Sequence, residues 1–155
     1  MKSAMIGLAL LVAVSGCKFK DEADRASKIE LMSSNIHLAA KIGLRKFLEN
    51  NEDKTQEIKA TIQRVRDILV THVLPAFGPE ANTTKLDFDT FVQGFLTTSE
   101  LDADVKDLLQ LAVVNMKPYI EMPSNPLDSL NPDTKAVLHA GFSALVRAFD
   151  DVLAL

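Results

Sequence analysis

Cysteine and aromatic residues are scarce in this chain, and so is positive charge. Among 155 residues there are one cysteine, one tyrosine and no tryptophan. A single cysteine cannot form a disulfide within the chain, and nothing around it has metal-ligand spacing. Acidic residues outnumber basic ones by 21 to 17. Nucleic acid is therefore not an expected partner, because binding to it depends on basic residues that neutralise phosphates.

The first seventeen residues have the pattern of an export signal. Lys2 precedes an uncharged, mostly apolar run over 4–14, which leads to Ser15, Gly16 and Cys17. A charged start, an apolar middle and an exit of small residues are typical of a signal peptide. A transmembrane helix needs about twenty apolar residues, so this run is too short for a stable span.

The segment Val14-Ser15-Gly16-Cys17 resembles the lipobox of bacterial lipoproteins. The resemblance implies cleavage between Gly16 and Cys17, a diacylglycerol on the Cys17 sulfur, and an acyl chain such as palmitate on the new amine. Two or three acyl chains hold a protein firmly on a membrane. The alternative is a free or disulfide-forming thiol, which gains no support because no second cysteine exists to pair with it.

The residue after the cysteine bears on location. Many Gram-negative lipoproteins retained at the inner membrane have aspartate there, whereas this chain has Lys18. By that analogy we expect an envelope protein of the outer membrane if the host is Gram-negative, and of the outer face of the cell membrane otherwise.

Three segments follow from this pattern. We expect a signal peptide over 1–16, a lipidated cysteine with a polar tether over 17–25, and one domain over 26–155. Loss of the signal removes Lys2 and leaves 16 basic against 21 acidic residues, a formal charge of −5. The remaining chain is long enough for one hydrophobic core without a disulfide.

Apolar spacings of three and four predict a first helix over about 22–49 and a second one that ends at Pro75. Asp53 and Gln56 resemble a capping box that opens the second helix. The apolar face of the first helix comprises Ile29, Met32, Ile36, Ala40, Gly43 and Phe47, widened by Leu31, Leu38, Ile42, Leu44 and Leu48. A face of this breadth predicts contact with two neighbouring helices.

A short helix is expected over about 86–96. Ser99 and Asp102 form a second capping box, which opens a helix that continues to Met116. From Leu108 onward this helix is apolar nearly all round, which predicts a central place in the fold.

Asn131 as cap, with Pro132 in the first turn, begins the last helix. Its buried seam is expected to comprise Leu138, Phe142, Leu145, Phe149 and Val152. Alternating strand patterns are lacking, so the expected fold is all-α: a single helical bundle of four long helices and one short helix, packed mostly antiparallel after the signal peptide.

Residues that resemble chemical sites lack the partners such sites need. The histidines fall on three different helices without a second ligand at metal spacing: His37, His72 and His139. The segment 86–91 resembles the end of an EF-hand loop without most of its ligands, so Asp87 is expected to cap a helix. Ser143 lies within an amphipathic helix and lacks the final glycine of a nucleophile elbow. We therefore expect no metal site, no catalytic residue and no enzyme activity.

Charged groups on two helices have the spacing of solvated faces. They are Asp150 and Asp151 near the C-terminus, and Lys41, Arg45 and Lys46 on the first helix. The basic group follows the tether closely, so contact with anionic lipid is an alternative to simple solvation.

The proline-rich segment 118–127 offers a partner-binding loop. Its apolar residues are Tyr119, Ile120, Met122 and Leu127. They either fold back over the core or remain available to a partner, and the prolines reduce the entropy lost on binding.

Two functional hypotheses follow. The first is a membrane-anchored, non-enzymatic helical module that binds another envelope protein, with phage or plasmid exclusion factors as one form of this role. The alternative is a carrier that holds a lipid or other apolar ligand in the bundle core, lined by 108–116, Phe142 and Phe149.

Overall fold

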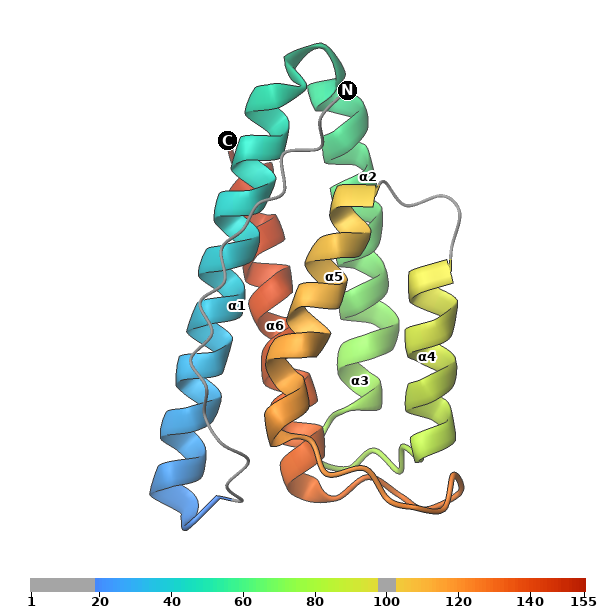
Figure 1. The fold of residues 1–155 in the computed structure, drawn as a ribbon. Coiled ribbons are helices and arrows are strands. Elements are labelled where there is room, and N and C mark those ends of the chain that lie inside the picture. Colours follow the sequence, from blue (N-terminus) through green and yellow to red (C-terminus); the bar gives the residue numbers. More distant parts are fainter. Residues whose placement is uncertain (1–18, 98–102) are drawn as a thin grey trace.

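The computed structural model describes residues 19–97 and 103–155, and this part of the chain is all-α, as predicted (Figure 1). The α-helices are α1 (Glu22–Asn50), α2 (Thr55–Ile68), α3 (Leu74–Ala76), α4 (Lys85–Thr97), α5 (Ala103–Met116) and α6 (Pro132–Leu153). Short 3-10 helices cover Glu52–Lys54 and Lys117–Tyr119, and a π-helical turn over Leu69–Val73 joins α2 to α3. Within the described residues, no helix combines the length and apolar character needed to cross a membrane.

Helix α1 begins where the sequence predicts. The carboxylate of Asp21 accepts a hydrogen bond from the backbone N–H of Asp24 at 2.8 Å, which satisfies one of the free donors at the helix start. The helix continues for 29 residues, or about 43 Å, until the backbone N–H of Asn51 bonds to the carbonyl of Leu48. It packs against both α5 and α6, so the predicted contact with two neighbours is confirmed.

Helix α6 occupies the centre of the fold. It contacts α1, α2, α3 and α5, and its predicted seam is confirmed, with every member at most 2% exposed: Leu138, Phe142, Leu145, Phe149 and Val152. Asn131 caps this helix as predicted, since its side chain accepts a hydrogen bond from the Thr134 backbone N–H at 2.7 Å.

The central place predicted for the helix ending at Met116 is wrong. Helix α5 buries Val105, Leu109, Ala112 and Met116 toward α6 and α1, whereas Val114 on its other side is 63% exposed. An apolar composition did not lead to full burial because neighbouring helices cover only part of α5, which lies in front of α6 and between α1 and α4 in Figure 1.

Helices α1 and α6 run in the same direction. Contacts between them advance together along both helices, from Arg25 with Asp133 to Lys41 with Asp151. This pair is therefore an exception to the predicted mostly antiparallel packing, since α2 and α5 run opposite to both α1 and α6 (Figure 1). The chain reverses direction four times between the two helices, which returns α6 to the direction of α1 (Figure 1).

The predicted start and end of the second helix both differ from the structure. Asp53 lies within the 3-10 turn and makes no capping bond; Lys54 occupies the cap position, and the Thr55 hydroxyl donates to the Glu52 carbonyl at 3.0 Å. At the other end the helix closes at Ala76, one residue beyond Pro75. A proline ring meets the carbonyl four residues before it in an α-helix, and here the widened π turn precedes Pro75.

Phenylalanine rings fill the core between α3, α4 and α6. Phe142 stacks on Phe77 with ring centroids 5.8 Å apart, and Phe91 meets Phe142 edge to face at 5.5 Å. Phe88 adds an edge contact to Phe77 at 6.1 Å. The predicted capping pair Ser99 and Asp102 lies outside the described residues.

Candidate functional site

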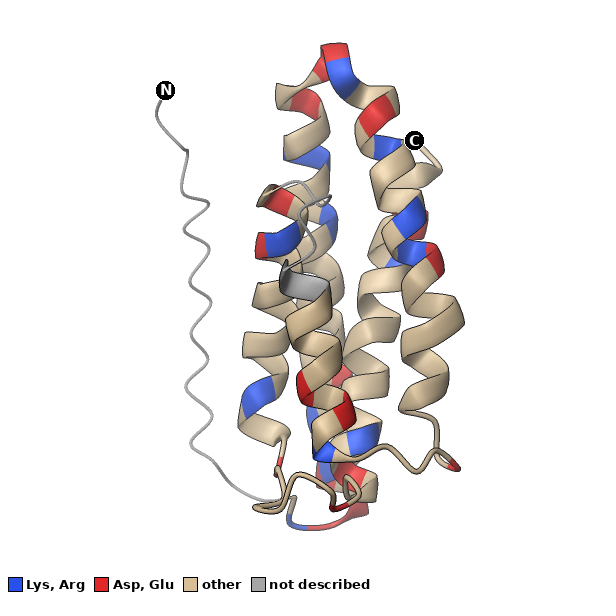
Figure 2. Cartoon of the chain, turned by 90° about the vertical axis from the view of Figure 1, so that its right-hand side faces the viewer, with Lys and Arg blue, Asp and Glu red and all other residues tan. Residues whose placement is uncertain are grey.

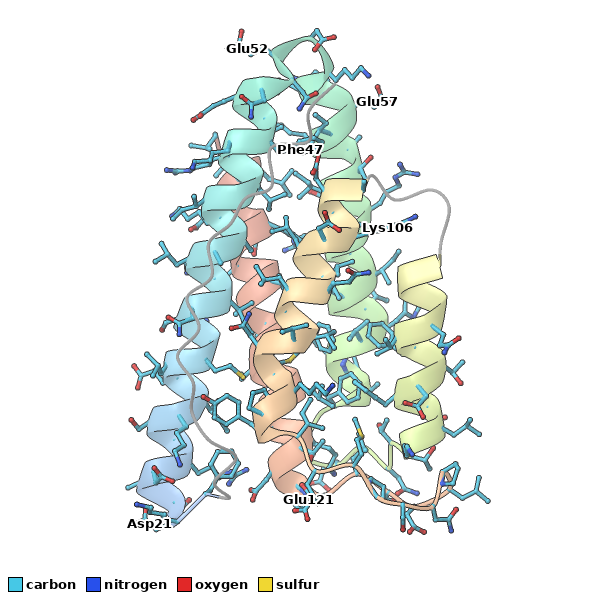
Figure 3. The ribbon with its side chains drawn as sticks, in the orientation of Figure 1. Asp21, Phe47, Glu52, Glu57, Lys106 and Glu121 are labelled. Carbon is cyan, nitrogen blue, oxygen red and sulfur yellow. The ribbon has the colours of Figure 1, made fainter. Side chains whose placement is uncertain are left out.

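One end of the bundle gathers segments that are far apart in the sequence (Figure 1). The first turns of α1 and α6 lie there because the two helices are parallel, and the loop 120–131 and the start of α4 lie beside them. In Figure 3, Asp21 and Glu121 mark this end, while Glu52 and Glu57 mark the opposite one. We call the first of these the tether end.

The last part of the tether is attached to this end. Phe19 stacks on Tyr119, with ring centroids 6.2 Å apart and planes at 5°. The Lys20 backbone N–H donates to Asp24 at 3.0 Å. Hydrogen bonds from the Lys28 side chain and from the Lys20 backbone hold the pKa of Asp24 below its usual value. The chain is thus fixed to the bundle before α1 begins.

Three of the four predicted partner-binding residues pack against the core. Tyr119, Ile120 and Met122 are half-buried against core residues. The buried Thr134 hydroxyl fixes the loop backbone, since it accepts from the Glu121 N–H at 3.0 Å and donates to the Glu121 carbonyl at 3.2 Å. These three residues mainly hold the loop against the core, and little of their surface is available to a partner.

Leu127, the fourth predicted residue, points outward and is 71% exposed. Its own N–H donates to the Asn125 side chain at 3.1 Å. On either side of it, the carbonyl of Pro126 accepts from the Leu86 N–H at 2.9 Å and that of Asp128 from the Lys85 N–H at 3.1 Å. Leu86 is itself 49% exposed, so two apolar side chains lie near each other on a hydrogen-bonded surface.

The predicted cleavage and lipidation residues, Gly16 and Cys17, lie outside the described residues. Phe19 is the first residue described, and it lies two positions after Cys17. That separation corresponds to at most about 7 Å of extended chain.

The histidines do not converge. His37 lies 3.0 Å from Asp151, whereas His72 and His139 are exposed on other helices. Within the described parts of the chain, no three histidine, cysteine or carboxylate side chains are grouped so that they could hold a metal ion.

The acidic pair near the C-terminus is not simply solvated, contrary to the sequence-based expectation. Asp151 accepts hydrogen bonds from Lys41 at 2.5 Å and from His37 at 3.0 Å, and these bonds hold its pKa below the usual value. Asp150 pairs with Arg66 of α2 at 2.7 Å. Both carboxylates therefore join α6 to a neighbouring helix.

Asp87 belongs to a capping box rather than to a calcium loop. Its carboxylate accepts from the Thr84 N–H at 2.9 Å, and the Thr84 hydroxyl oxygen accepts in return from the Asp87 N–H at 3.2 Å. Thr84 is thus the cap, and Asp87 supports it from the first turn of α4. The two hydrogen bonds from Thr84 hold the pKa of Asp87 below its usual value.

An exposed apolar row on α1 was assigned to the wrong face. Leu31, Leu38 and Ile42 are 52%, 56% and 37% exposed, although their spacing predicts that they widen the buried face. At 100° per residue they fall within about 40° of one another, and the buried Met32, Ile36 and Ala40 are centred about 140° away. Their mutual spacings of seven and four residues place them on a face of their own, and this was the signal that could have distinguished them from the buried face. We call these three residues the α1 outer row.

Basic side chains follow the α1 outer row. Arg45 and Lys46 are exposed, and neither makes an ion pair with another residue of the described ranges. Lys41, the third member of the predicted basic face, forms an ion pair with Asp151. The outer surface of α1 thus combines an apolar row with two cations that have no ion-pair partner in the described part of the chain.

Searches with family models, among curated protein sequences and among solved structures give no match for this chain.

Proposed function

We propose that this protein is a lipid-anchored, non-enzymatic helical module of the bacterial envelope that binds another envelope protein. The lipobox at Cys17 supports the anchor. If the host is Gram-negative, Lys18 in place of aspartate favours the outer membrane.

The α1 outer row is the observation that carries the binding role. Long apolar side chains on a solvated helix face bury apolar area when a partner covers them, and these three lie along one line of the helix at spacings of seven and four residues. Leu31 and Leu38 expose about half of their surface although the same helix buries Leu44 and Leu48. The row lies on a long, regular helix, so it presents a rigid surface to a partner.

The partner is expected to combine an apolar strip with acidic residues. Arg45 and Lys46 extend the row at one end, and an interface places opposite charges against such groups. An amphipathic helix of another envelope protein has this chemistry, because such a helix docks by residues at spacings of three, four and seven. A second copy of this chain is the competing occupant.

The anchor is tested by replacing Cys17. The Cys17→Ser variant loses the acceptor sulfur, so we expect an uncleaved or soluble product without acyl mass, whereas the Lys18→Ser control keeps the thiol and stays in the membrane fraction. Intact mass measurement and membrane fractionation read the two outcomes. A wild-type chain without acyl mass, or a cleaved Cys17→Ser product that stays in the membrane fraction, contradicts the anchor.

The binding role is tested by photo-crosslinking in cells. A photoreactive residue at Leu38 is expected to capture one heterologous envelope protein, while the same residue at Gln63, exposed on α2, captures none. Leu38→Glu combined with a reactive residue at Ser34 should abolish that product. If the residue at Leu38 crosslinks to a second copy of this chain, the partner is the chain itself and the interface forms a homodimer. Equal crosslinking from Leu38 and Gln63 refutes the α1 outer row as the interface.

A further inference from the structure

We propose that the tether end of the bundle rests on the bilayer and that Leu127 and Leu86 contact lipid there. This inference rests on the proposed lipid anchor and adds an orientation to it. The surface is assigned to lipid, rather than to a protein partner, by the position of the tether.

The tether leaves little freedom between the anchor and this end. Cys17 is two residues from Phe19, about 7 Å of extended chain at most. Phe19 is stacked on Tyr119, which immediately precedes the loop 120–131. Acyl chains on Cys17 lie within the bilayer, so the loop that follows Tyr119 must lie close to the headgroups.

The surface that faces the proposed anchor exposes two leucines on a hydrogen-bonded backbone. Leu127 is 71% and Leu86 49% exposed, and the backbones of these two segments are joined by the bonds from Leu86 to Pro126 and from Lys85 to Asp128. Leucine on a surface next to a membrane inserts at the boundary between headgroups and acyl chains. The hydrogen-bonded loop therefore holds its apolar side chain ready for contact.

The tip of the loop is uncharged although the end of the bundle around it carries charges. Residues 122–127 have no charged side chain, whereas Asp128 comes directly after this segment, and Asp21 and Glu121 lie at the same end (Figure 3). Figure 2 shows acidic and basic residues at this end as well as at the turn between α1 and α2. Burial of charged groups in lipid is costly, so we expect the charged residues to remain among the headgroups and the exposed leucines to make the apolar contact.

End-on contact also leaves the side of the bundle free. Helix α1 extends about 43 Å away from the tether end, so the α1 outer row faces the surrounding water instead of lying on the bilayer. The membrane contact and the proposed partner contact thus use different surfaces.

Single tryptophans test the orientation, because the chain contains none. The Leu127→Trp variant reports on the tether end, Leu155→Trp on the C-terminus and Leu38→Trp on the side of α1. Each replaces a leucine that is more than half exposed, so none removes a core side chain. The purified acylated chains are reconstituted into phosphatidylcholine vesicles with and without brominated acyl chains, which quench tryptophan only at close range.

For Leu127→Trp we expect a blue-shifted emission that brominated lipid quenches, and for Leu155→Trp and Leu38→Trp an emission that it leaves unchanged. Equal emission from Leu127→Trp and Leu155→Trp, both unquenched, overturns the proposal. Quenching of Leu38→Trp alone also overturns it, because α1 then lies flat on the membrane.

Intact mass, measured first on each preparation, separates this inference from the anchor. An acylated chain whose Leu127→Trp variant is not quenched refutes the orientation and leaves the anchor intact. A bare thiol refutes the natural anchor; the sole cysteine is then coupled to a maleimide phospholipid, and the same vesicle measurement decides the orientation of the anchored bundle.

Discussion

Replacing two glycines by alanine should change stability in opposite directions. Gly141 lies where α6 packs against α5, and a Cβ added there would be 2.1 Å from Met116 Sδ and 2.8 Å from its Cγ. Gly94 lies within α4, and a Cβ added there would have no atom within 4 Å. The chemical change is the same at both positions, so only the surroundings differ.

The expected magnitudes follow from two competing terms. Alanine in a helix is more favourable than glycine by about 1 kcal/mol. At Gly94 this term acts alone, and we expect the free energy of unfolding to rise by roughly 0.5–1 kcal/mol. At Gly141 the fully buried Met116 must move by more than an ångström, and overpacking of a filled core costs about 1–3 kcal/mol. We therefore expect Gly141→Ala to be about 1 kcal/mol less stable than wild type after the helix term is subtracted.

Gly43 provides an intermediate case. A Cβ there would lie 3.2 Å from Leu108 Cδ2, the far end of a flexible side chain, so a small shift of Leu108 should nearly cancel the gain from alanine. Urea unfolding followed by circular dichroism would rank the variants, with Gly94→Ala first, Gly43→Ala near wild type and Gly141→Ala last. If Gly141→Ala is as stable as Gly94→Ala, Met116 is not tightly held, and the close packing of α5 on α6 described above is wrong.

Two further predictions concern the ends of helices. Hydrogen bonds from Lys41, and secondly from His37, hold the pKa of Asp151 in the folded protein below that of an unfolded aspartate, which is about 3.9. The ionised carboxylate therefore stabilises the fold above about pH 3.9, and this stabilisation is lost as the pH falls through the pKa of the folded state. The difference in urea midpoint between wild type and Asp151→Asn should thus be present at neutral pH and shrink in strong acid, and a difference that grows in acid contradicts the linkage. Thr84→Ala should lower the free energy of unfolding by about 1 kcal/mol, because it removes the cap of α4. Thr90 is exposed in the same helix, so Thr90→Ala should leave the free energy of unfolding unchanged. Equal losses from the two variants would argue against the cap.

Local signals in the sequence predicted individual helices well. Asn131 with Pro132 fixed the start of α6, because a side-chain acceptor and a restricted φ act within one turn and need no distant partner. The seam from Leu138 to Val152 was equally legible, since a helix at the centre of a bundle has a buried face set by its own periodicity.

Relations between helices were harder to infer. Leu31 and Leu38 are as apolar as Leu44 and Leu48, and their exposure depends on where α5 and α6 end up, not on their own chemistry. The apolar character of α5 likewise did not reveal that Val114 has no helix over it among the described residues. Composition indicates that a residue favours burial, but the packing of neighbours decides whether burial occurs.

The contact between Phe19 and Tyr119 shows what this difference means for the candidate site. A phenylalanine in a polar tether gives no sign of a partner a hundred residues later, and only the parallel arrangement of α1 and α6 brings the two rings together. The same arrangement places the ion pair of Arg25 with Asp133, whose atoms are 2.8 Å apart, across the first turns of both helices. An antiparallel pair would have put the start of α6 and the loop before it at the far end of α1, away from the tether. The direction of the last helix therefore determines which loop lies next to the proposed anchor and which surfaces are left for the proposed protein partner.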